Sequence, residues 1–232
     1  MGNGERAARV LLARLDAVAD EAGADVGRWL TADEAARLQA MSLPARRRSF
    51  LAGHWLARRL AADWLQAGIG RIALHRHPDG RPQLLLDGAP TALALSLSHS
   101  GEWLACAIAD VPVGIDVELS RRRRDLDALA RFAFAPEEAE RLRQLPEPER
   151  SATFHTLWTL REARGKRKGE GMLPAQSRRI SAMPGDAVHA EATSWSMLDG
   201  ALALAVEAGT RIEVEGGEVL DSPRYWRFVE AG

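Results

Sequence analysis

Apolar residues recur at helical spacing in the first part of the chain. Leu11 and Leu15 would share one face of a helix over residues 10–22, and a glycine follows as a helix stop. Thr31 is placed to cap a second helix, because a glutamate that could complete a capping box stands three residues further on. After a proline, a longer amphipathic helix is predicted over residues 45–67.

Short apolar runs bounded by turn residues predict strands in two groups. The first group follows the long helix, and the second occupies the last part of the chain. A turn at residues 78–80 separates the first two strands. The predicted strands are 72–75, 84–86, 104–108 and 114–118, then one around Ile180, 192–197, 201–206 and a hairpin that turns at Gly216 and Gly217 between Ile212 and Leu220.

A second set of helices separates the two groups of strands. Pro136 would begin one helix, and further prolines interrupt the pattern after it. Ser151 is placed to cap the next helix, which carries Trp158 among its apolar residues. Helices followed by strands therefore occur twice, so the sequence predicts an α+β protein with two similar α+β lobes. We place these lobes at residues 1–113 and 114–232 of one compact unit.

Three carboxylates in two of these elements could meet around a divalent cation. Side chains of a strand alternate between its faces, so Asp116 and Glu118 would point the same way. On the helix that contains Trp158, four-residue spacing places Glu162 beside Lys166. Carboxylates from a strand and a helix suit Mg2+, which takes further oxygens from water and phosphate. Taken alone, each pair is more often a solvated strand end or a routine surface contact.

Composition narrows the class of protein. The 232 residues are 46% hydrophobic and 27% charged, as in ordinary globular proteins. With 31 basic and 32 acidic residues the formal net charge is -1, which argues against a protein that coats nucleic acid. The one cysteine, Cys106, excludes an intramolecular disulfide and suits a reducing compartment. No apolar run approaches the ~20 residues of a membrane span, so we expect a cytoplasmic protein.

A third motif joins the two acidic ones. Ser98-His99-Ser100-Gly101 precedes an apolar strand, Gly-Ile-Asp-Val-Glu follows, and Trp-x-x-(Lys/Arg)-Glu-Ala-x-x-Lys comes last. In order and spacing these motifs resemble those of the 4′-phosphopantetheinyl transferases of the surfactin-activating (Sfp) type. Weaker matches extend the resemblance across most of the chain, at residues 47–53, at Gly80-Arg81-Pro82 and at residues 166–172.

The resemblance implies an activity and a role for each site residue. Such enzymes transfer the 4′-phosphopantetheine arm of CoA to a serine of an apo acyl or peptidyl carrier protein and release adenosine 3′,5′-bisphosphate. The resemblance also implies that CoA lies in the cleft between the lobes and that Mg2+ is the cofactor. The implied metal ligands are Asp116, Glu118 and Glu162; the implied catalytic residues are Glu162 and Lys166; the implied CoA contacts are Arg48, Arg81, Pro82, Ser98, His99 and Lys166, with His99 at the 3′-phosphate.

Two positions depart from the family pattern. Arg161 stands where lysine is commoner, which keeps the charge but changes the geometry of its hydrogen bonds. Glu170 stands where a basic residue is common, which would weaken contact with an acidic carrier protein. Neither residue is an implied metal ligand, so we expect activity to survive both changes.

Two other classes of protein stay open. A Mg2+-dependent nuclease could also use a strand aspartate with a helix glutamate and lysine, although Asp/Glu-x-Lys on one strand is missing and the net charge is not basic. A non-catalytic module that binds CoA or a carrier protein would be favoured by loss of a metal ligand, and all three are present. The expected partners are CoA and an apo carrier protein. We expect no nucleic acid, no membrane and a monomer.

Overall fold

The computed structural model describes residues 6–24, 26–77, 80–120, 124–197 and 199–231, so the predicted turn at residues 78–80 lies partly outside the described residues. The first group of elements is β1 (Ala7–Arg14), α1 (Leu15–Ala24), α2 (Val26–Trp29), α3 (Ala32–Gln39), α4 (Pro44–Leu65), η1 (Ile69–Arg71), β2 (Ile72–Arg76), β3 (Pro82–Leu86), β4 (Ala89–Ser100) and β5 (Trp103–Ala109). The second group is β6 (Gly114–Leu119), α5 (Leu126–Ala133), α6 (Pro136–Arg143), α7 (Glu149–Lys168), α8 (Pro174–Ser177), β7 (Ile180–Pro184), β8 (Ala192–Met197), β9 (Gly200–Ala205), β10 (Arg211–Glu215), η2 (Gly217–Val219) and β11 (Arg224–Glu230).

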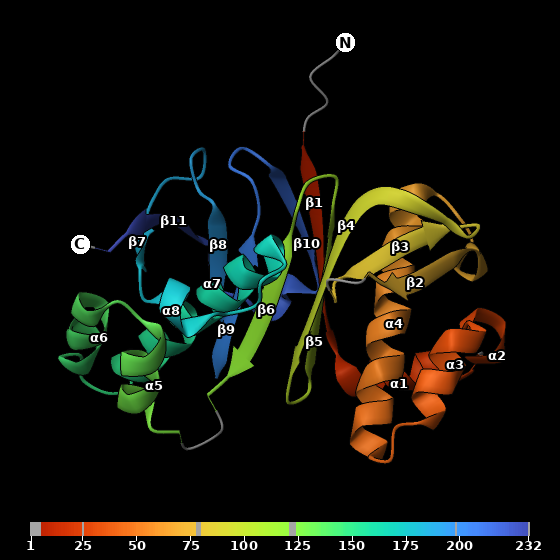
Figure 1. Ribbon diagram of the computed structural model, residues 1–232, viewed down its shortest axis with the longest axis horizontal. Coiled ribbons are helices and arrows are strands. Elements are labelled where there is room, and N and C mark those ends of the chain that lie inside the picture. The colour runs from red at the N-terminus through yellow and green to blue at the C-terminus, as the bar shows by residue number, and fades with distance from the viewer. Residues whose placement is uncertain (1–5, 25, 78–79, 121–123, 198, 232) are drawn as a thin grey trace, which may run out of the picture.

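The strands form two sheets that pack against each other between two long helices. The first sheet has the order β10-β1-β5-β4-β3-β2, and the second has the order β6-β9-β8-β11-β7. Helix α4 covers the first sheet and α7 covers the second (Figure 1). On β5, Leu104, Cys106 and Ile108 face α4, while the alanines between them face the second sheet. The alternation of a strand therefore assigns its residues to two separate cores.

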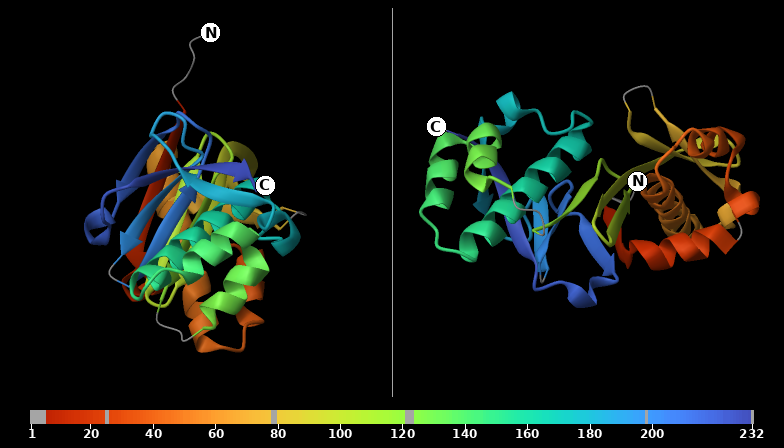
Figure 2. Two further views of the ribbon diagram at one scale, coloured as in Figure 1. Left: turned by 90° about the vertical axis from the view of Figure 1, so that its left-hand side faces the viewer. Right: turned by 90° about the horizontal axis from the view of Figure 1, so that it is seen from below.

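This arrangement confirms the predicted α+β class with two lobes. Seen from below, the helices of the first group lie at one end of the molecule and those of the second group at the other (Figure 2). β6 opens the second sheet at Gly114, whereas β10 returns to the first sheet and pairs in parallel with β1. The division into residues 1–113 and 114–232 stays a prediction.

The helix predicted over residues 10–22 is wrong in its first part. β1 occupies these positions first, and α1 begins only at Leu15. β1 lies between β5 and β10 and is buried on both faces, with Leu11 toward α4 and Val10 toward the second sheet. A strand buried on both faces is apolar at consecutive positions, so its sequence lacks the alternation that separates strands from helices.

Two smaller local predictions are also wrong. The glycine pair at Gly216 and Gly217 does not turn a hairpin, because β10 before it pairs with β1 and a short 3-10 turn follows. Gly216 has a φ of +72°, and a Cβ there would lie 2.0 Å from the backbone oxygen of Leu12, so this glycine serves a close approach between strands. Ser151 is not a cap, since α7 begins at Glu149.

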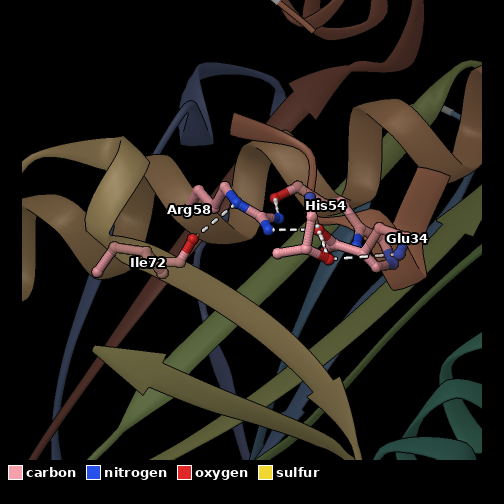
Figure 3. A network of polar contacts seen from close by, with 5 residues as sticks. Glu34, His54, Arg58 and Ile72 are labelled. Carbon is pink, nitrogen blue, oxygen red and sulfur yellow. Dashed lines mark hydrogen bonds and ion pairs between the residues drawn. The ribbon is translucent and has the colours of Figure 1, made fainter. Parts of the chain in front are cut away.

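The capping box predicted at Thr31 is confirmed and extends into a buried ionic network (Figure 3). The Glu34 carboxylate accepts the Thr31 backbone N–H at 2.9 Å and Nη2 of Arg58 at 2.6 Å. Nδ1 of His54 lies 2.6 Å from its other oxygen. Burial acts to raise the pKa of Glu34, but the hydrogen bond with His54 and the charge of Arg58 outweigh it and lower the pKa to about 2.

We expect this network to make an acid-sensitive contribution to stability. The folded-state pKa of Glu34 lies below its usual value of 4.5, so the contribution is complete above that value and is lost as the pH falls toward 2. The shift corresponds to roughly 3 kcal/mol. In urea unfolding, the free-energy difference between the parent and Glu34→Gln should shrink from about pH 5 to about pH 2.5. A difference that stays constant over this range would contradict the prediction.

Candidate active site

Gly114 brings β6 into backbone contact with α7, and Gly165 brings α7 into backbone contact with the chain that follows it. A Cβ on Gly114, the first residue of β6, would lie 2.0 Å from the carbonyl oxygen of Ala163 and 2.4 Å from the amide nitrogen of Arg167. A Cβ on Gly165 would lie 2.2 Å from the carbonyl oxygen of Gly171, where the chain returns past the helix. Side chains do not fit at such distances. Gly114 therefore lets the two acidic motifs meet, and Gly165 lets the chain after α7 pack on the helix.

Lys166 reaches from α7 to Asp116 on β6. Its Nζ lies 2.8 Å from Oδ1 of Asp116 and donates to the carbonyl oxygen of Ile115 at 3.0 Å. Ser98 on β4 donates its hydroxyl to the same Oδ1 at 2.7 Å. Asp116 is 5% exposed, and its Oδ2 has no hydrogen-bond partner among the described residues. A buried carboxylate oxygen without a donor is costly, because it has lost water without compensation.

Glu118 on β6 and Glu162 on α7 interact with the same aspartate. Burial, followed by the negative charge of Asp116, raises the pKa of both carboxyls, and the ammonium of Lys166 opposes this for both. Arg124, 3.9 Å from Glu118, opposes it further there. Three carboxylates are thus gathered with too little positive charge around them. Within the described ranges, however, no three Asp, Glu, His or Cys side chains stand in the arrangement of a preformed metal site.

A basic cavity opens beside this cluster. It encloses about 450 Å³ between β2, β3, β4 and the end of α7. Arg81, Pro82 and Lys166 line it. Gly169 ends α7 with a φ of +76°, and a Cβ there would lie 2.9 Å from Nε of Arg81. The other charged or polar side chains of the lining are Arg37, His54, His75, Arg76 and Ser96, and such a lining suits an anionic ligand.

Two of the predicted CoA contacts, Arg48 and His99, are neither among the lining residues nor at the carboxylates. Arg48 forms ion pairs with Asp16 and Asp20 of α1, each at 2.8 Å. His99 is exposed on β4, on the face that carries Leu95 and Leu97 of the cavity lining and not on that of Ser98, because neighbouring side chains of a strand alternate. The other predicted site residues surround the carboxylates or the cavity.

The sequence alone does not reveal that α3, α4 and β2 contribute to the cavity. Arg37, His54 and Arg76 line it from these elements. They belong to no local motif, and only the packing of helices over the first sheet brings them together. The one sign in the sequence of a polar site at these elements was His54, within the long predicted helix.

Comparison with known proteins gives the family. A family model described as the 4′-phosphopantetheinyl transferase superfamily matches residues 112–206. The 4′-phosphopantetheinyl transferase HetI of Nostoc sp. is 32% identical over 177 residues, 75% of this chain and 75% of that protein. A solved structure of a holo-(acyl-carrier-protein) synthase from Bacillus anthracis, in complex with CoA (3′,5′-ADP), aligns with a TM-score of 0.39 and 19% identity, over 46% of this chain and 96% of that chain.

The chain therefore belongs to the 4′-phosphopantetheinyl transferase superfamily and is a transferase. It is similar as well to the transferase Sfp of Bacillus subtilis strain 168, with 35% identity over 83 residues, 35% of this chain and 36% of that protein. These matches confirm the resemblance seen in the three motifs. No helix in the described part of the chain is long and apolar enough to cross a membrane.

Proposed function

We propose that the protein transfers the 4′-phosphopantetheine arm of CoA to a serine of an apo acyl or peptidyl carrier protein, with Mg2+, and releases adenosine 3′,5′-bisphosphate. The observation that supports this most directly is the ion pair of the buried Asp116 with the half-buried Lys166 beside a basic cavity, in a member of this superfamily. Catalysis at a pyrophosphate rests on positioning and on charge neutralisation, and these groups can supply both.

The carboxylates fit a hard divalent cation. Oδ2 of Asp116 receives no hydrogen bond from any residue that the structure describes, and the pKa values of Glu118 and Glu162 are raised by burial and by Asp116. A cation among these groups would supply the missing positive charge. Asp116, Glu118 and Glu162 would therefore hold Mg2+, which when bound stabilises the negative charge of the reacting pyrophosphate.

The chain itself would supply a proton acceptor and a fixed cation. The serine oxygen forms a bond to the phosphorus next to pantetheine, and the bond to the second phosphate breaks as adenosine 3′,5′-bisphosphate leaves. Glu162 would accept the serine proton. Lys166 would stabilise the phosphate oxygens from a position that the Ile115 carbonyl oxygen helps to hold.

CoA would occupy the basic cavity. Arg81, Pro82 and Lys166 line that cavity, and the Ser98 hydroxyl lies at the carboxylates. His99 remains our proposed contact for the 3′-phosphate. Arg48 remains a proposed CoA contact, although it is paired with acidic residues of α1.

The proposal is tested by mixing the protein with CoA, Mg2+ and a panel of apo carrier proteins and measuring intact carrier mass. We expect a mass increase of one phosphopantetheine on at least one carrier, and none when EDTA or a serine-to-alanine carrier is used. Saturable CoA binding with no modified carrier would instead favour a non-catalytic binding module. Metal-dependent cleavage of DNA would favour a nuclease.

We expect the carrier protein to dock partly through charge. Arg167 and Lys168 lie at the end of α7 beside Lys166, and carriers of this kind are acidic around the modified serine. Arg167→Glu combined with Lys168→Glu should raise the KM for the carrier about tenfold and change that for CoA less than twofold. The effect should weaken with added salt.

Two consecutive exposed arginines, Arg178 and Arg179, provide the control for this test. Arg178→Glu combined with Arg179→Glu introduces the same charge change outside α7, and its carrier KM should stay near that of the parent. Equal effects of the two double variants would mean that docking depends on net charge alone, and no effect of the first would place the docking surface elsewhere.

A further inference from the structure

One buried Glu–Arg arrangement occurs in the first lobe around Arg58 of α4. Nη2 of Arg58 donates to Glu34 of α3 at 2.6 Å (Figure 3). Its Nε donates to the carbonyl oxygen of Ile72, the first residue of β2, at 3.0 Å, and its Nη1 donates to that of His54 at 3.2 Å. We call these contacts the N-terminal clasp. They tie α4 at once to α3, to β2 and to its own preceding turn.

The second lobe contains the same arrangement around Arg161 of α7. Nη2 of Arg161 donates to Glu138 of α6 and to the carbonyl oxygen of Ile180, the first residue of β7, at 3.0 Å. Its Nη1 donates to the carbonyl oxygen of Leu157 at 3.2 Å. We call these contacts the C-terminal clasp. The Glu138 carboxylate extends it to β7 by accepting the N–H of Ala182 at 3.2 Å.

The two clasps correspond closely, but Nε of Arg58 binds the strand carbonyl oxygen in one, whereas Nη2 of Arg161 does so in the other and its Nε has no partner among the described residues. Glu34 and Glu138 are each the third residue of an eight-residue helix. The arginines follow them by 24 and 23 residues, and each donates to the carbonyl oxygen four residues before its own. Each guanidinium also lies over an aromatic ring that precedes the short helix, at 4.9 Å from Trp29 and at 4.4 Å from Phe134. The clasp is therefore a duplicated part of the fold.

The two clasp arginines themselves do not line the proposed CoA site, although His54 of the N-terminal clasp does. Arg58 and Arg161 are 0% and 2% exposed, and neither lines the basic cavity. The N-terminal clasp occurs in a lobe whose first strand, β1, carries no carboxylate at all, so the arrangement does not depend on the acidic cluster. Arg161 nevertheless immediately precedes Glu162 on α7, and the same helix carries Ala163 against Gly114.

We propose that Arg161 is a positioning residue: through the C-terminal clasp it fixes α7 against α6 and β7 and so sets where Glu162 and Lys166 stand relative to Asp116. Its effect on turnover rests on the proposed function, whereas its effect on the helix does not. A lysine has one nitrogen in place of the planar fork and cannot hold the carboxylate, both carbonyl oxygens and the ring contact together. In this chain the arginine therefore ties α7 to α6 and β7 at once.

The test compares Arg161→Lys with Arg58→Lys, which makes the same change in the N-terminal clasp. Amide hydrogen exchange is measured for peptides of α4 and α7, and kcat and KM for CoA are measured with the carrier that the parent modifies. We expect Arg161→Lys to speed exchange in α7 alone and to lower kcat about tenfold or more, with the KM for CoA within about twofold, because small displacements of reacting groups cost large factors in rate. Arg58→Lys should speed exchange in α4 and leave kcat within about twofold.

Unchanged exchange in α7 of Arg161→Lys, or a fall in kcat no greater than that of Arg58→Lys, overturns the proposal. If Arg161→Lys does not fold, Glu138→Gln replaces it under the same criteria, because glutamine keeps the shape and one oxygen acceptor of the glutamate. A parent without transferase activity on any carrier would count against the proposed function, while the exchange measurement would still decide the role of the clasp.

Discussion

Asp116→Asn is expected to lower kcat for carrier modification by about a thousandfold or more. The substitution removes the charge that pairs with Lys166 and the carboxylate with which Glu118 and Glu162 both interact. Stabilisation of transition-state charge by a bound metal amounts to several kcal/mol, and each ~1.4 kcal/mol is a factor of ten in rate. We expect Glu162→Gln to have an effect of similar size. Initial rates from intact carrier mass, at saturating CoA and Mg2+, measure both.

A glutamate on the same helix provides the control for these two variants. Glu149 is exposed at the start of α7, so Glu149→Gln should keep the parent rate. The melting temperature of the parent should rise when Mg2+ and CoA are added, and that of Asp116→Asn should rise much less. Turnover like that of the parent in Asp116→Asn or Glu162→Gln, at ordinary Mg2+ concentrations, would contradict the assignment of the carboxylates to a metal.

The acidic cluster was predictable because its geometry is local. Alternation along β6 is enough to put Asp116 and Glu118 on one face, and the spacing along α7 is enough to place Glu162 near Lys166. The contact between the two elements also depends on a motif residue, because Gly114 of Gly-Ile-Asp-Val-Glu is the residue at which β6 touches α7. The cavity was predictable only in part, because Arg37 and His54 belong to no sequence motif and reach it through the packing of α3 and α4.

The fold was predictable where one segment decides its own structure. The capping box at Thr31 is such a case, because the residues that satisfy the helix N-terminus are three positions apart. The strand β1 and the pairing of β10 were not predictable, because their partners lie far away in the sequence: Val10 pairs with Val214 in one direction and with Ala107 in the other. The role of Arg161 was likewise hidden, since Glu138 and Ile180 lie on different elements.

Gly114→Ala is expected to destabilise the protein by at least about 3 kcal/mol. The added Cβ would stand 2.0 Å from the carbonyl oxygen of Ala163 and 2.4 Å from the amide nitrogen of Arg167. Both are backbone atoms, so no side-chain rotation relieves the clash, and β6 has to move away from α7. For a protein of this size the melting temperature should fall by about 6 °C or more, and any folded fraction should have lost transfer, because Asp116 and Lys166 separate.

Gly53→Ala provides the matched control, because it adds the same methyl group to a buried glycine within α4. The nearest atom to a Cβ there is Cδ1 of Leu104 at 4.0 Å, which is an ordinary contact distance. Since alanine is the better helix former, this variant should be as stable as the parent or more stable by about 0.5 to 1 kcal/mol, with unchanged transfer. Thermal melts that give Gly114→Ala the stability of Gly53→Ala would show that β6 and α7 do not touch at this glycine.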